Sequence, residues 1–414
     1  MQKNSFDEKL VVRQKQSSKI MSKIDLKTQE SPYLVNIYHN ILWPKYKGSI
    51  FSGLHDFALP SDVDISFFQI AKTTNDRKNL GEVDFSYHRY PYKLLFNGTY
   101  DSIPKFKLCR ILFEHAAHSN ANLVILPGYH LLEYWFMLLG CILTRKKRAV
   151  FVDSTGNDQP DSIFKDVLKR IFFRSCDGFF GYGQRSKQYL MSFGVPEHKI
   201  TTRCQAAALP HHYTPQCALS SRMERRKEGV PAHYLFVGVL TENKGIDILI
   251  QAFHRLHLQD PMALLTIVGD GDVHAELQAL VVSLDMSDAV NFTGALHIDV
   301  LESHYLQASC LILPSRSEAW GLVVNEALSY GCPAIVSDRC GCAPDLIVEG
   351  ETGYVFNMDD VADLAKKMSL VKTDLNDVPK VATDCINLMQ KFTPEKAAAQ
   401  ILKGCYNILT TGEE

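Results

Sequence analysis

Two acidic residues, Glu318 and Glu326, lie on either side of a glycine in a stretch that could bind a diphosphate. The stretch 311–356 is predicted to contain an apolar strand, a polar loop and a helix that begins near Gly321. A helix N-terminus presents unpaired backbone N–H groups and the positive end of the helix dipole. The pattern therefore predicts a phosphate or diphosphate site at the start of this helix.

The positions of the two carboxylates extend this prediction to a sugar nucleotide. Gly321 has no side chain where the phosphates would approach the backbone amides of Leu322 and Val323. Helical side chains lean toward the N-terminus, so Glu326 could reach ligand hydroxyl groups at that end. Glu318, in the preceding loop, could reach another part of the same ligand. Carboxylates that face hydroxyls beside a diphosphate are typical of a nucleotide-sugar site.

The stretch resembles the E-x7-E segment of retaining family 4 glycosyltransferases, which have the GT-B fold. The family pattern is a Pro-Ser-x-x-Glu-x-Phe/Trp-Gly loop followed by a Glu-Ala-Leu/Met helix. It is matched here by Pro314, Ser315, Glu318, Trp320, Gly321, Glu326 and Ala327. The resemblance continues through the segments GCPAIVSD and ETGYVF. It implies two Rossmann-like domains that face each other across a cleft holding donor and acceptor.

A second segment, 236–250, resembles the family's first phosphate loop, with Gly238 and Lys244 in place. Val239 stands where the family usually has an arginine. In relatives that arginine and the lysine together neutralise the distal phosphate as it leaves. In this chain we expect Lys244 to act without the arginine, assisted by Arg316 or by the helix N-terminus.

The resemblance also implies a role for each donor-site residue. Glu318 and Lys244 are the expected catalytic residues, with Glu318 at the transferred sugar and Lys244 at the phosphates. Glu326 would hold the ribose. The remaining expected donor-binding residues are Gly238, Val239, Val268, Gly269, Gly294, Ala295, Ser315, Trp320, Gly321, Leu322 and Val323.

The resemblance implies a retaining glycosyltransferase that moves a sugar from a nucleoside diphosphate, expected to be UDP or GDP, to a hydroxyl acceptor, a glycan or a lipid-linked saccharide. The resemblance is to enzymes of bacterial surface-polysaccharide assembly, which work without a bound metal or cofactor. One alternative is a nucleotide-sugar epimerase or phosphorylase on the same fold. Another is a non-catalytic nucleotide-sugar-binding subunit, which Val239 favours and the intact Glu318, Glu326 and Lys244 disfavour.

Composition excludes several other classes. The formal net charge of −2 over 414 residues gives no indication of nucleic-acid binding. The cysteines, 11 in all, show no zinc-ligand spacing with histidine and are interpreted as free thiols of a reducing compartment. No apolar run reaches membrane-spanning length. We therefore expect a cytoplasmic protein, with attachment to the inner face of the membrane as a further option.

The chain alternates strand and helix patterns twice, which predicts two parallel-sheet α/β domains. We expect a mobile N-terminal extension at 1–30, followed by an N-terminal acceptor-binding domain at 31–205. A linker at 206–231 leads to a C-terminal nucleotide-sugar-binding domain at 232–392. The last helix, within 393–414, is expected to return to the first domain. In the first domain, strands are predicted at 33–38, 64–71, 122–126, 149–153 and 178–182, with helices at 105–117, 129–143, 163–173 and 185–193.

Loops at the carboxyl ends of the first domain's strands are the expected acceptor site, because ligands of parallel sheets bind there. The first is a long loop with glycines that runs from His39 to Gly53. The expected acceptor-binding residues are Asn40, Trp43, Gly48, His130 and Asp153. Each also has an ordinary structural interpretation: Trp43 as core, His130 as a helix-start residue, Asp153 as a loop cap.

The segment 162–174 combines an apolar stripe with lysines and arginines, and a basic run, RKKR, lies nearby at 145–148. A basic amphipathic helix can lie on an anionic membrane surface. The commoner role of such a helix is packing on a core with its lysines in solvent. Membrane contact becomes the better interpretation if the acceptor is lipid-linked.

Overall fold

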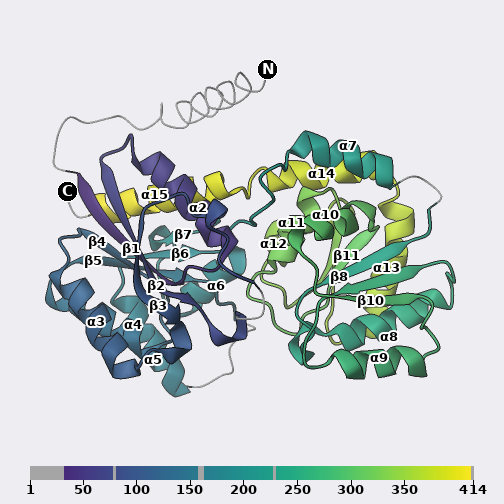
Figure 1. The fold of residues 1–414 in the computed structure, drawn as a ribbon, viewed down its shortest axis with the longest axis horizontal. Helices are drawn as coiled ribbons and strands as arrows, with labels where there is room; N and C mark the ends of the chain where they lie inside the picture. Colours follow the sequence, from purple (N-terminus) through teal and green to yellow (C-terminus); the bar gives the residue numbers. More distant parts are fainter. Residues whose placement is uncertain (1–31, 78–80, 157–162, 227–229, 412–414) are drawn as a thin grey trace.

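The computed structural model describes residues 32–77, 81–156, 163–226 and 230–411. In these residues the chain forms two α/β domains, each with a parallel sheet between layers of helices (Figure 1). This agrees with the predicted fold class. The predicted extension at 1–30 lies outside the described residues.

The N-terminal domain contains a seven-stranded parallel sheet in the order β3-β2-β1-β4-β5-β6-β7. Its strands are β1 (Tyr33–Ile41), β2 (Val63–Thr73), β3 (Tyr92–Thr99), β4 (Leu123–Leu126), β5 (Lys147–Val152), β6 (Gly178–Gly181) and β7 (Ile200–Thr201). Its helices are α2 (Lys45–Ala58), α3 (Lys105–His118), α4 (Leu132–Leu143), α5 (Ile163–Arg174) and α6 (Gln184–Ser192). The central strand β4 is apolar throughout and fully buried, as helices on both sheet faces require.

The C-terminal domain contains a six-stranded parallel sheet in the order β10-β9-β8-β11-β12-β13. Its strands are β8 (His233–Val237), β9 (Leu264–Val268), β10 (Val290–Gly294), β11 (Cys310–Leu313), β12 (Ala334–Ser337) and β13 (Gly353–Phe356). Its helices are α7 (Pro215–Arg225), α8 (Ile246–His257), α9 (His274–Ser283), α10 (Ile298–Gln307), α11 (Leu322–Ser329), α12 (Ala343–Leu346), α13 (Val361–Asp374) and α14 (Val378–Met389). Short 3-10 turns lie at Asn75–Arg77, Phe85–Tyr87, Tyr100–Ser102, Glu197–Lys199 and Glu242–Lys244.

Each sheet reverses its strand order once, between β1 and β4 and between β8 and β11. At such a point the loops that follow the two strands diverge to opposite faces of the sheet and leave a crevice between them. The crevices are therefore expected after β1 and β4 in one domain and after β8 and β11 in the other. The predicted acceptor and donor loops occupy these two positions.

The last helix, α15 (Pro394–Thr410), runs back from the C-terminal domain and packs on α2 of the N-terminal domain (Figure 1). Its buried face includes Ala398, Ile401 and Cys405, which join the core beneath β1 and β5. The ammonium of Lys147 donates to the carbonyls of Ile408, Leu409 and Thr411 at 2.8, 2.7 and 2.9 Å, and so holds the helix's C-terminal end.

Two predicted loops are helical in the structure. The expected acceptor loop becomes α2 from Lys45 onward, because its glycines serve close packing rather than turns. A Cβ at Gly48 would lie 2.8 Å from the His88 ring, so the glycine lets the helix approach that side chain. Within the expected linker 206–231, α7 forms and packs on α10 and α14, which leaves 202–214 as the crossing segment. The edge strands β3 and β7 were not predicted.

Candidate functional site

Backbone packing joins the loops that follow β8 and β11. Gly245 has φ +63°, and a Cβ there would lie only 2.0 Å from the carbonyl oxygen of Pro314. Only glycine can meet both requirements. The contact places Lys244, from the first loop, beside Glu318, from the second.

Lys244 and Glu318, the two expected catalytic residues, form an ion pair. Both side chains are partly buried, so a ligand can still reach them. The pair places a cation and a carboxylate side by side at the carboxyl edge of the sheet. A bound diphosphate would compete with Glu318 for the ammonium, and this would free the carboxylate for sugar hydroxyls.

Arg316 does not take the place of the arginine missing at Val239. Its guanidinium makes two hydrogen bonds to the Asp247 carboxylate, at 2.9 and 2.7 Å, and a third to the Glu242 carbonyl at 2.5 Å. These contacts tie the loop to the start of α8. Arg316 is therefore not free to assist Lys244 as expected. Val239, in the first phosphate loop, is 49% exposed.

The N-terminus of α11 has the geometry expected of a diphosphate site. Gly321 caps the helix with φ +98°, and a Cβ there would lie 2.7 Å from the Leu313 side chain. The first intrahelical bond runs from the Val324 amide to the Gly321 carbonyl at 3.0 Å. The amides of Leu322 and Val323 precede that bond, at the positive end of the helix dipole.

Glu326, one turn further along α11, is held by a side chain of α10. The Tyr305 hydroxyl donates to its Oε2 at 2.8 Å. Burial raises the pKa of Glu326 to about 7, and the hydrogen bond from Tyr305 offsets only part of that effect. The carboxyl group therefore holds its proton more tightly than an ordinary glutamate does, and ligand hydroxyls would favour its ionised form.

Glycine packing also assembles the expected nucleotide-base pocket. A Cβ at Gly269, which has φ +140°, would lie 1.8 Å from the Gly238 carbonyl oxygen. The Gly238 amide donates to Val268 at 3.0 Å, and the Gly269 amide donates to Gly294 at 2.9 Å. The ends of β8, β9 and β10 therefore lie against one another, with Ala295 exposed just beyond them.

Two expected donor contacts, the side chains of Trp320 and Ser315, are buried instead. Trp320 is 3% exposed, and its Nε1 donates to Asn325 Oδ1 at 2.8 Å. Ser315 is fully buried, and its carbonyl accepts from Ser337 Oγ at 2.6 Å. Both residues support the loop that carries Glu318, and their role as donor contacts stays a prediction.

On the acceptor side, three of the five expected residues line one hollow. Asn40, His130 and Asp153 surround a cavity of about 180 Å³ at the carboxyl ends of β1, β4 and β5. Trp43 and Gly48 are not among its lining residues. Trp43 donates from Nε1 to the Gly81 carbonyl at 3.0 Å, and Gly48 lies inside α2.

The same cavity contains residues that the sequence did not single out, notably Tyr46, Lys47 and Tyr182. They come from α2 and from the end of β6, so no local motif contains them together. Lys47 lies in the segment that was predicted to be a loop. Pro44 was the signal that could have identified Lys47, because a proline often precedes or opens a helix and Lys47 lies in the buried first turn of α2.

The acceptor-side cavity adjoins the donor loops. Tyr182, one of its walls, meets Trp320 edge-on with ring centroids 6.3 Å apart. Close to Tyr182, the backbone N–H of Gln184 donates to Asp345 Oδ2 of the C-terminal domain at 2.8 Å. The strand ends of the two domains therefore face each other, with the Glu318 loop on one side and the cavity on the other.

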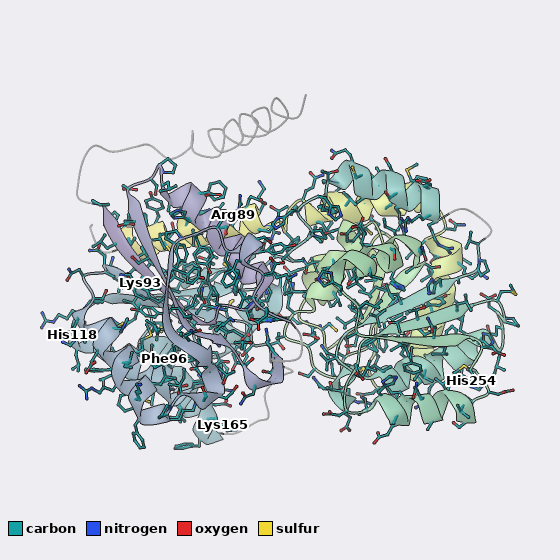
Figure 2. The ribbon with its side chains drawn as sticks, viewed as in Figure 1. Arg89, Lys93, Phe96, His118, Lys165 and His254 are labelled. Carbon is teal, nitrogen blue, oxygen red and sulfur yellow. The ribbon has the colours of Figure 1, made fainter. Side chains whose placement is uncertain are left out.

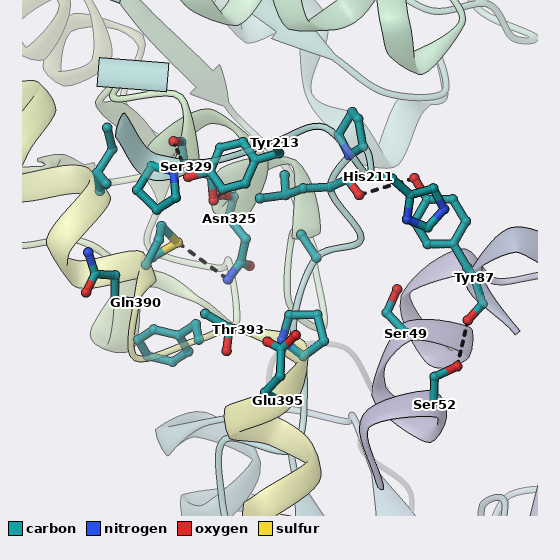
Figure 3. Close-up of a pocket in the computed structure, with 18 of the residues that line it drawn as sticks. Ser49, Ser52, Tyr87, His211, Tyr213, Asn325, Ser329, Gln390, Thr393 and Glu395 are labelled. Atoms are coloured by element: carbon teal, nitrogen blue, oxygen red, sulfur yellow. Dashed lines mark hydrogen bonds between the residues drawn. The ribbon is translucent and has the colours of Figure 1, made fainter. Parts of the chain in front are cut away.

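A separate hollow of about 300 Å³ lies at the domain junction between α2, the crossing segment and the turn from α14 to α15 (Figure 3). Its lining includes Ser52, Tyr87, His211, Asn325 and Glu395. None of the expected donor or acceptor residues lines it. Its polar groups also bond to one another, as with Ser52 Oγ and the Tyr87 carbonyl at 2.9 Å.

Two Rossmann-like domains arranged in this way define the GT-B class. Solved structures of that class match the fold. One is a lipopolysaccharide outer core galactosyltransferase, WaaB, with a TM-score of 0.67 and 16% identity; the match covers 90% of this chain and 99% of WaaB. The HepE protein of Anabaena, solved with UDP and glucose, has a TM-score of 0.66 at 14% identity, with the same coverage of 90% and 99%.

The chain belongs to the glycosyl transferases group 1 family, whose model matches residues 221–387. An uncharacterized glycosyltransferase of Haemophilus influenzae is 31% identical over 313 residues, which are 74% of this chain and 81% of that protein. Other curated relatives are matched over shorter shares. A sulfoquinovosyl transferase of Arabidopsis thaliana is 36% identical over 34% of this chain, and the match covers 26% of that protein. A D-inositol 3-phosphate glycosyltransferase of Corynebacterium efficiens is 30% identical over 49% of this chain, and the match covers 49% of that protein.

Two searches of the described residues bear on membrane and metal binding. Within 32–77, 81–156, 163–226 and 230–411, none of the helices combines the length and the apolar character that crossing a membrane requires. The same residues contain no cluster of three or more His, Cys, Asp or Glu side chains arranged to hold a metal ion.

Proposed function

We propose that this protein is a retaining glycosyltransferase that transfers a sugar from a nucleoside diphosphate, UDP or GDP, to a hydroxyl acceptor. The observation that supports this most directly is the contact between Lys244 and Glu318 beside the N-terminus of α11. A cation and a helix N-terminus stabilise a diphosphate, and the two flanking carboxylates accept hydrogen bonds from sugar and ribose hydroxyls.

Transfer breaks the bond between the anomeric carbon and the diphosphate and forms one to the acceptor oxygen on the same face. The proton of the acceptor hydroxyl leaves with the diphosphate oxygen. Lys244 and the amides at the start of α11 stabilise the negative charge that develops on the leaving group. Glu318 stabilises positive charge at the anomeric carbon, and Glu326 orients the donor through its ribose. No resident metal or cofactor is part of this proposal.

The test begins with a thermal-shift screen of UDP-, GDP- and ADP-linked sugars, because a ligand that binds the folded state raises the melting temperature. The donor that gives the largest shift is then incubated with saccharide and glycolipid acceptors, and the anomeric configuration of the product is determined by NMR. A product with inverted configuration would contradict the proposal, and so would failure of every donor to bind.

Val239 supports a second candidate function, a nucleotide-sugar-binding subunit without catalysis. Its exposed apolar side chain stands where relatives have a cation, and Arg316 is bonded elsewhere. Donor binding without hydrolysis or transfer would favour this candidate. Release of an epimerised sugar nucleotide, or phosphate-dependent cleavage of a glycan, would indicate the epimerase or phosphorylase alternatives.

We also propose that the protein acts in polysaccharide or glycolipid synthesis at the inner face of a membrane, with contact through 162–174. Exposed apolar side chains support this contact and extend it from α5 to the adjacent helix α4; they are Leu132, Phe136, Leu139, Ile142, Leu143, Phe164, Val167, Leu168 and Ile171. The two helices pack through Trp135 and Phe172, whose ring centroids are 5.1 Å apart.

The positive charge around this surface favours an anionic membrane as the partner. Lys165, Arg170 and Arg174 are exposed on α5, and Figure 2 shows Lys165 on the outer side of the N-terminal domain. The neighbouring run 145–148 contributes less than expected, because its last three residues donate to backbone carbonyls of the protein. Arg145 remains exposed.

Vesicle flotation tests the membrane proposal. The protein is expected to float with vesicles that contain phosphatidylglycerol and to stay behind with phosphatidylcholine alone. Replacing Phe136 and Phe164 together by glutamate should abolish flotation, whereas Val282→Glu on α9, also at an exposed apolar residue, should not. Absence of wild-type binding to the anionic vesicles would overturn the membrane contact and leave the transfer proposal untouched.

A further inference from the structure

Lys47, in the first turn of α2, carries a charge that the described residues leave without a hydrogen-bond acceptor. The residue is 3% exposed, and its Nζ has no hydrogen-bond partner there. Its surroundings are aromatic: Nζ lies 4.7 Å from the centroid of the Phe151 ring and 5.2 Å from that of Tyr182. Cation–π contacts hold the ammonium in place but satisfy none of its three N–H donors. A buried charge without an acceptor is costly, so such a residue is a candidate for ligand binding.

The cavity that Lys47 lines contains a second unsatisfied group. Asn40 Oδ1 is buried and has no hydrogen-bond donor among the described residues. Together they present an ammonium that lacks an acceptor and an amide oxygen that lacks a donor. A ligand that satisfies both has a negatively charged group and a hydroxyl group.

The other lining residues agree with an anion. Arg77 also lines the cavity, with its guanidinium over the Trp43 ring at 5.1 Å. Burial lowers the pKa of His39 to about 3, so this side chain is neutral. The one carboxylate among the lining residues, Asp153, is exposed; its charge favours the protonated form of Lys47 through space, but it forms no ion pair within 4 Å of Lys47 in the described residues. Burial lowers the pKa of Lys47 only to about 8, so its charge persists at neutral pH.

Size and position indicate a single sugar or polyol unit. The cavity, of about 180 Å³, is smaller than the roughly 300–1,000 Å³ typical of sites for drug-sized ligands. Phe151 supplies an apolar wall on which a sugar face can rest. Tyr182 separates the cavity from Trp320 in the loop that carries Glu318.

We propose that this cavity binds an anionic acceptor, a sugar or polyol bearing a phosphate or carboxylate, with Lys47 as the counter-ion of that group and Asn40 Oδ1 as the acceptor for one of its hydroxyls. The assignment of this ligand as the acceptor rests on the proposed glycosyl transfer. The binding site itself does not depend on transfer.

Direct binding tests the proposal. Titration calorimetry with glucose 6-phosphate, glucuronic acid and glucose compares two anions with a neutral sugar of the same ring. The wild-type protein is expected to bind at least one anion about tenfold or more tightly than glucose, as a charge-assisted hydrogen bond implies. Preference for the phosphate or for the carboxylate identifies which anionic group the site takes.

Lys47→Met keeps the length of the side chain and removes its charge, so the preference for anions should disappear. The melting temperature of this variant should be unchanged or higher, because a buried unpaired charge is lost. Lys45→Met is the matched control: it removes a cation two residues earlier on the same helix, outside the cavity, and should keep the preference.

Binding of UDP and GDP to each variant, followed by thermal shift, reports the donor site separately. Anion preference that depends on Lys47 would sustain the inference even if neither nucleotide bound, and the transfer proposal alone would then fail. Equal binding of glucose and both anions by the wild type would overturn the inference, as would an anion preference that survives in Lys47→Met.

Discussion

The donor-side loops and the acceptor-side cavity occupy equivalent positions, each at the point where a parallel sheet reverses its strand order, but they are built differently. The donor side is assembled by backbone contacts at Gly245 and Gly269, and its charged groups are already paired. The acceptor side is assembled from side chains of separate elements, and it leaves Lys47 and Asn40 unsatisfied. One side is thus held ready by its own contacts, whereas the other is completed by its ligand.

The largest effect is expected where a side chain would break the backbone contact between the donor loops. Gly245→Ala places a methyl group 2.0 Å from the Pro314 carbonyl oxygen, so the loops must separate. We expect a loss of roughly 2–4 kcal/mol in the free energy of unfolding, from steric overlap added to backbone strain. Nucleotide binding, measured by calorimetry, should be lost as well.

Gly350→Ala is the control for that prediction. Gly350 also has positive φ, +76°, but a Cβ there would meet nothing within 4 Å. Only the backbone strain should remain, about 1 kcal/mol in urea unfolding. Equal destabilisation by the two variants would show that the contact with Pro314 is not what joins the donor loops.

Glu318→Gln should lower the transfer rate without loss of fold. The amide cannot stabilise positive charge at the anomeric carbon, and removal of one such electrostatic contact typically lowers kcat by about 100-fold or more. Stability should change little because the ion pair with Lys244 is partly solvent-exposed. Steady-state kinetics and urea unfolding measure the two effects, and a parallel loss of both would indicate a structural role.

Glu326 should make donor affinity depend on pH. Burial raises its pKa from about 4.5 to about 7, so the folded state holds this proton more tightly than the unfolded state does. Its stabilising contribution is complete below about pH 4.5 and is lost as the pH rises through about 7. Donor binding should change in the opposite direction, because ribose hydroxyls donate to the ionised carboxylate. Affinity should therefore weaken by up to about tenfold for each pH unit below 7.

Two variants check the pH prediction by calorimetry between pH 5.5 and 8.5. Glu326→Gln should bind the donor weakly and without this pH dependence. Tyr305→Phe removes a hydrogen bond that favours the ionised carboxylate and should move the midpoint to higher pH. A midpoint that stays in place in both variants would assign the pH dependence to another group.

Lys147→Met should have the smallest effect on nucleotide binding, because its effect on stability should be confined to the N-terminal domain. The ammonium satisfies three carbonyls at the end of α15, so its loss should lower the free energy of unfolding by about 1–2 kcal/mol. Nucleotide binding should be unchanged in calorimetry. Weaker nucleotide binding would show that the two sides are not independent.

The same contrast explains what the sequence could predict. The expected donor residues lie in short segments with local patterns, so the amino-acid sequence alone predicted that Gly321, Glu318 and Lys244 belong to one site. The structure places Lys244 against Glu318 and Gly321 at the start of α11, and their role toward a donor stays a prediction. Buried apolar strands such as β4 were predicted for the same reason. The acceptor cavity has no local pattern, because Lys47, Tyr182 and Asp153 come from three elements that only the completed sheet brings together.

The errors have specific physical causes. Gly48 and Gly53 indicated a loop, but both lie inside α2, where Gly48 allows the close approach of the His88 ring, a contact that no local pattern reveals. Edge strand β3 has no buried residue and no regular alternation of burial, and it was missed. Trp320 matches the donor motif in sequence, yet its ring is taken up by contacts with Tyr182 and Phe392.

The return of α15 to the N-terminal domain has a consequence for synthesis on the ribosome. Ala398, Ile401 and Cys405 cover part of a core whose other members are translated first. The N-terminal domain is therefore completed only after the C-terminal domain has been translated, and part of one face of its sheet stays uncovered until α15 has emerged from the ribosome. In a nascent chain, that face would be the natural target for a chaperone.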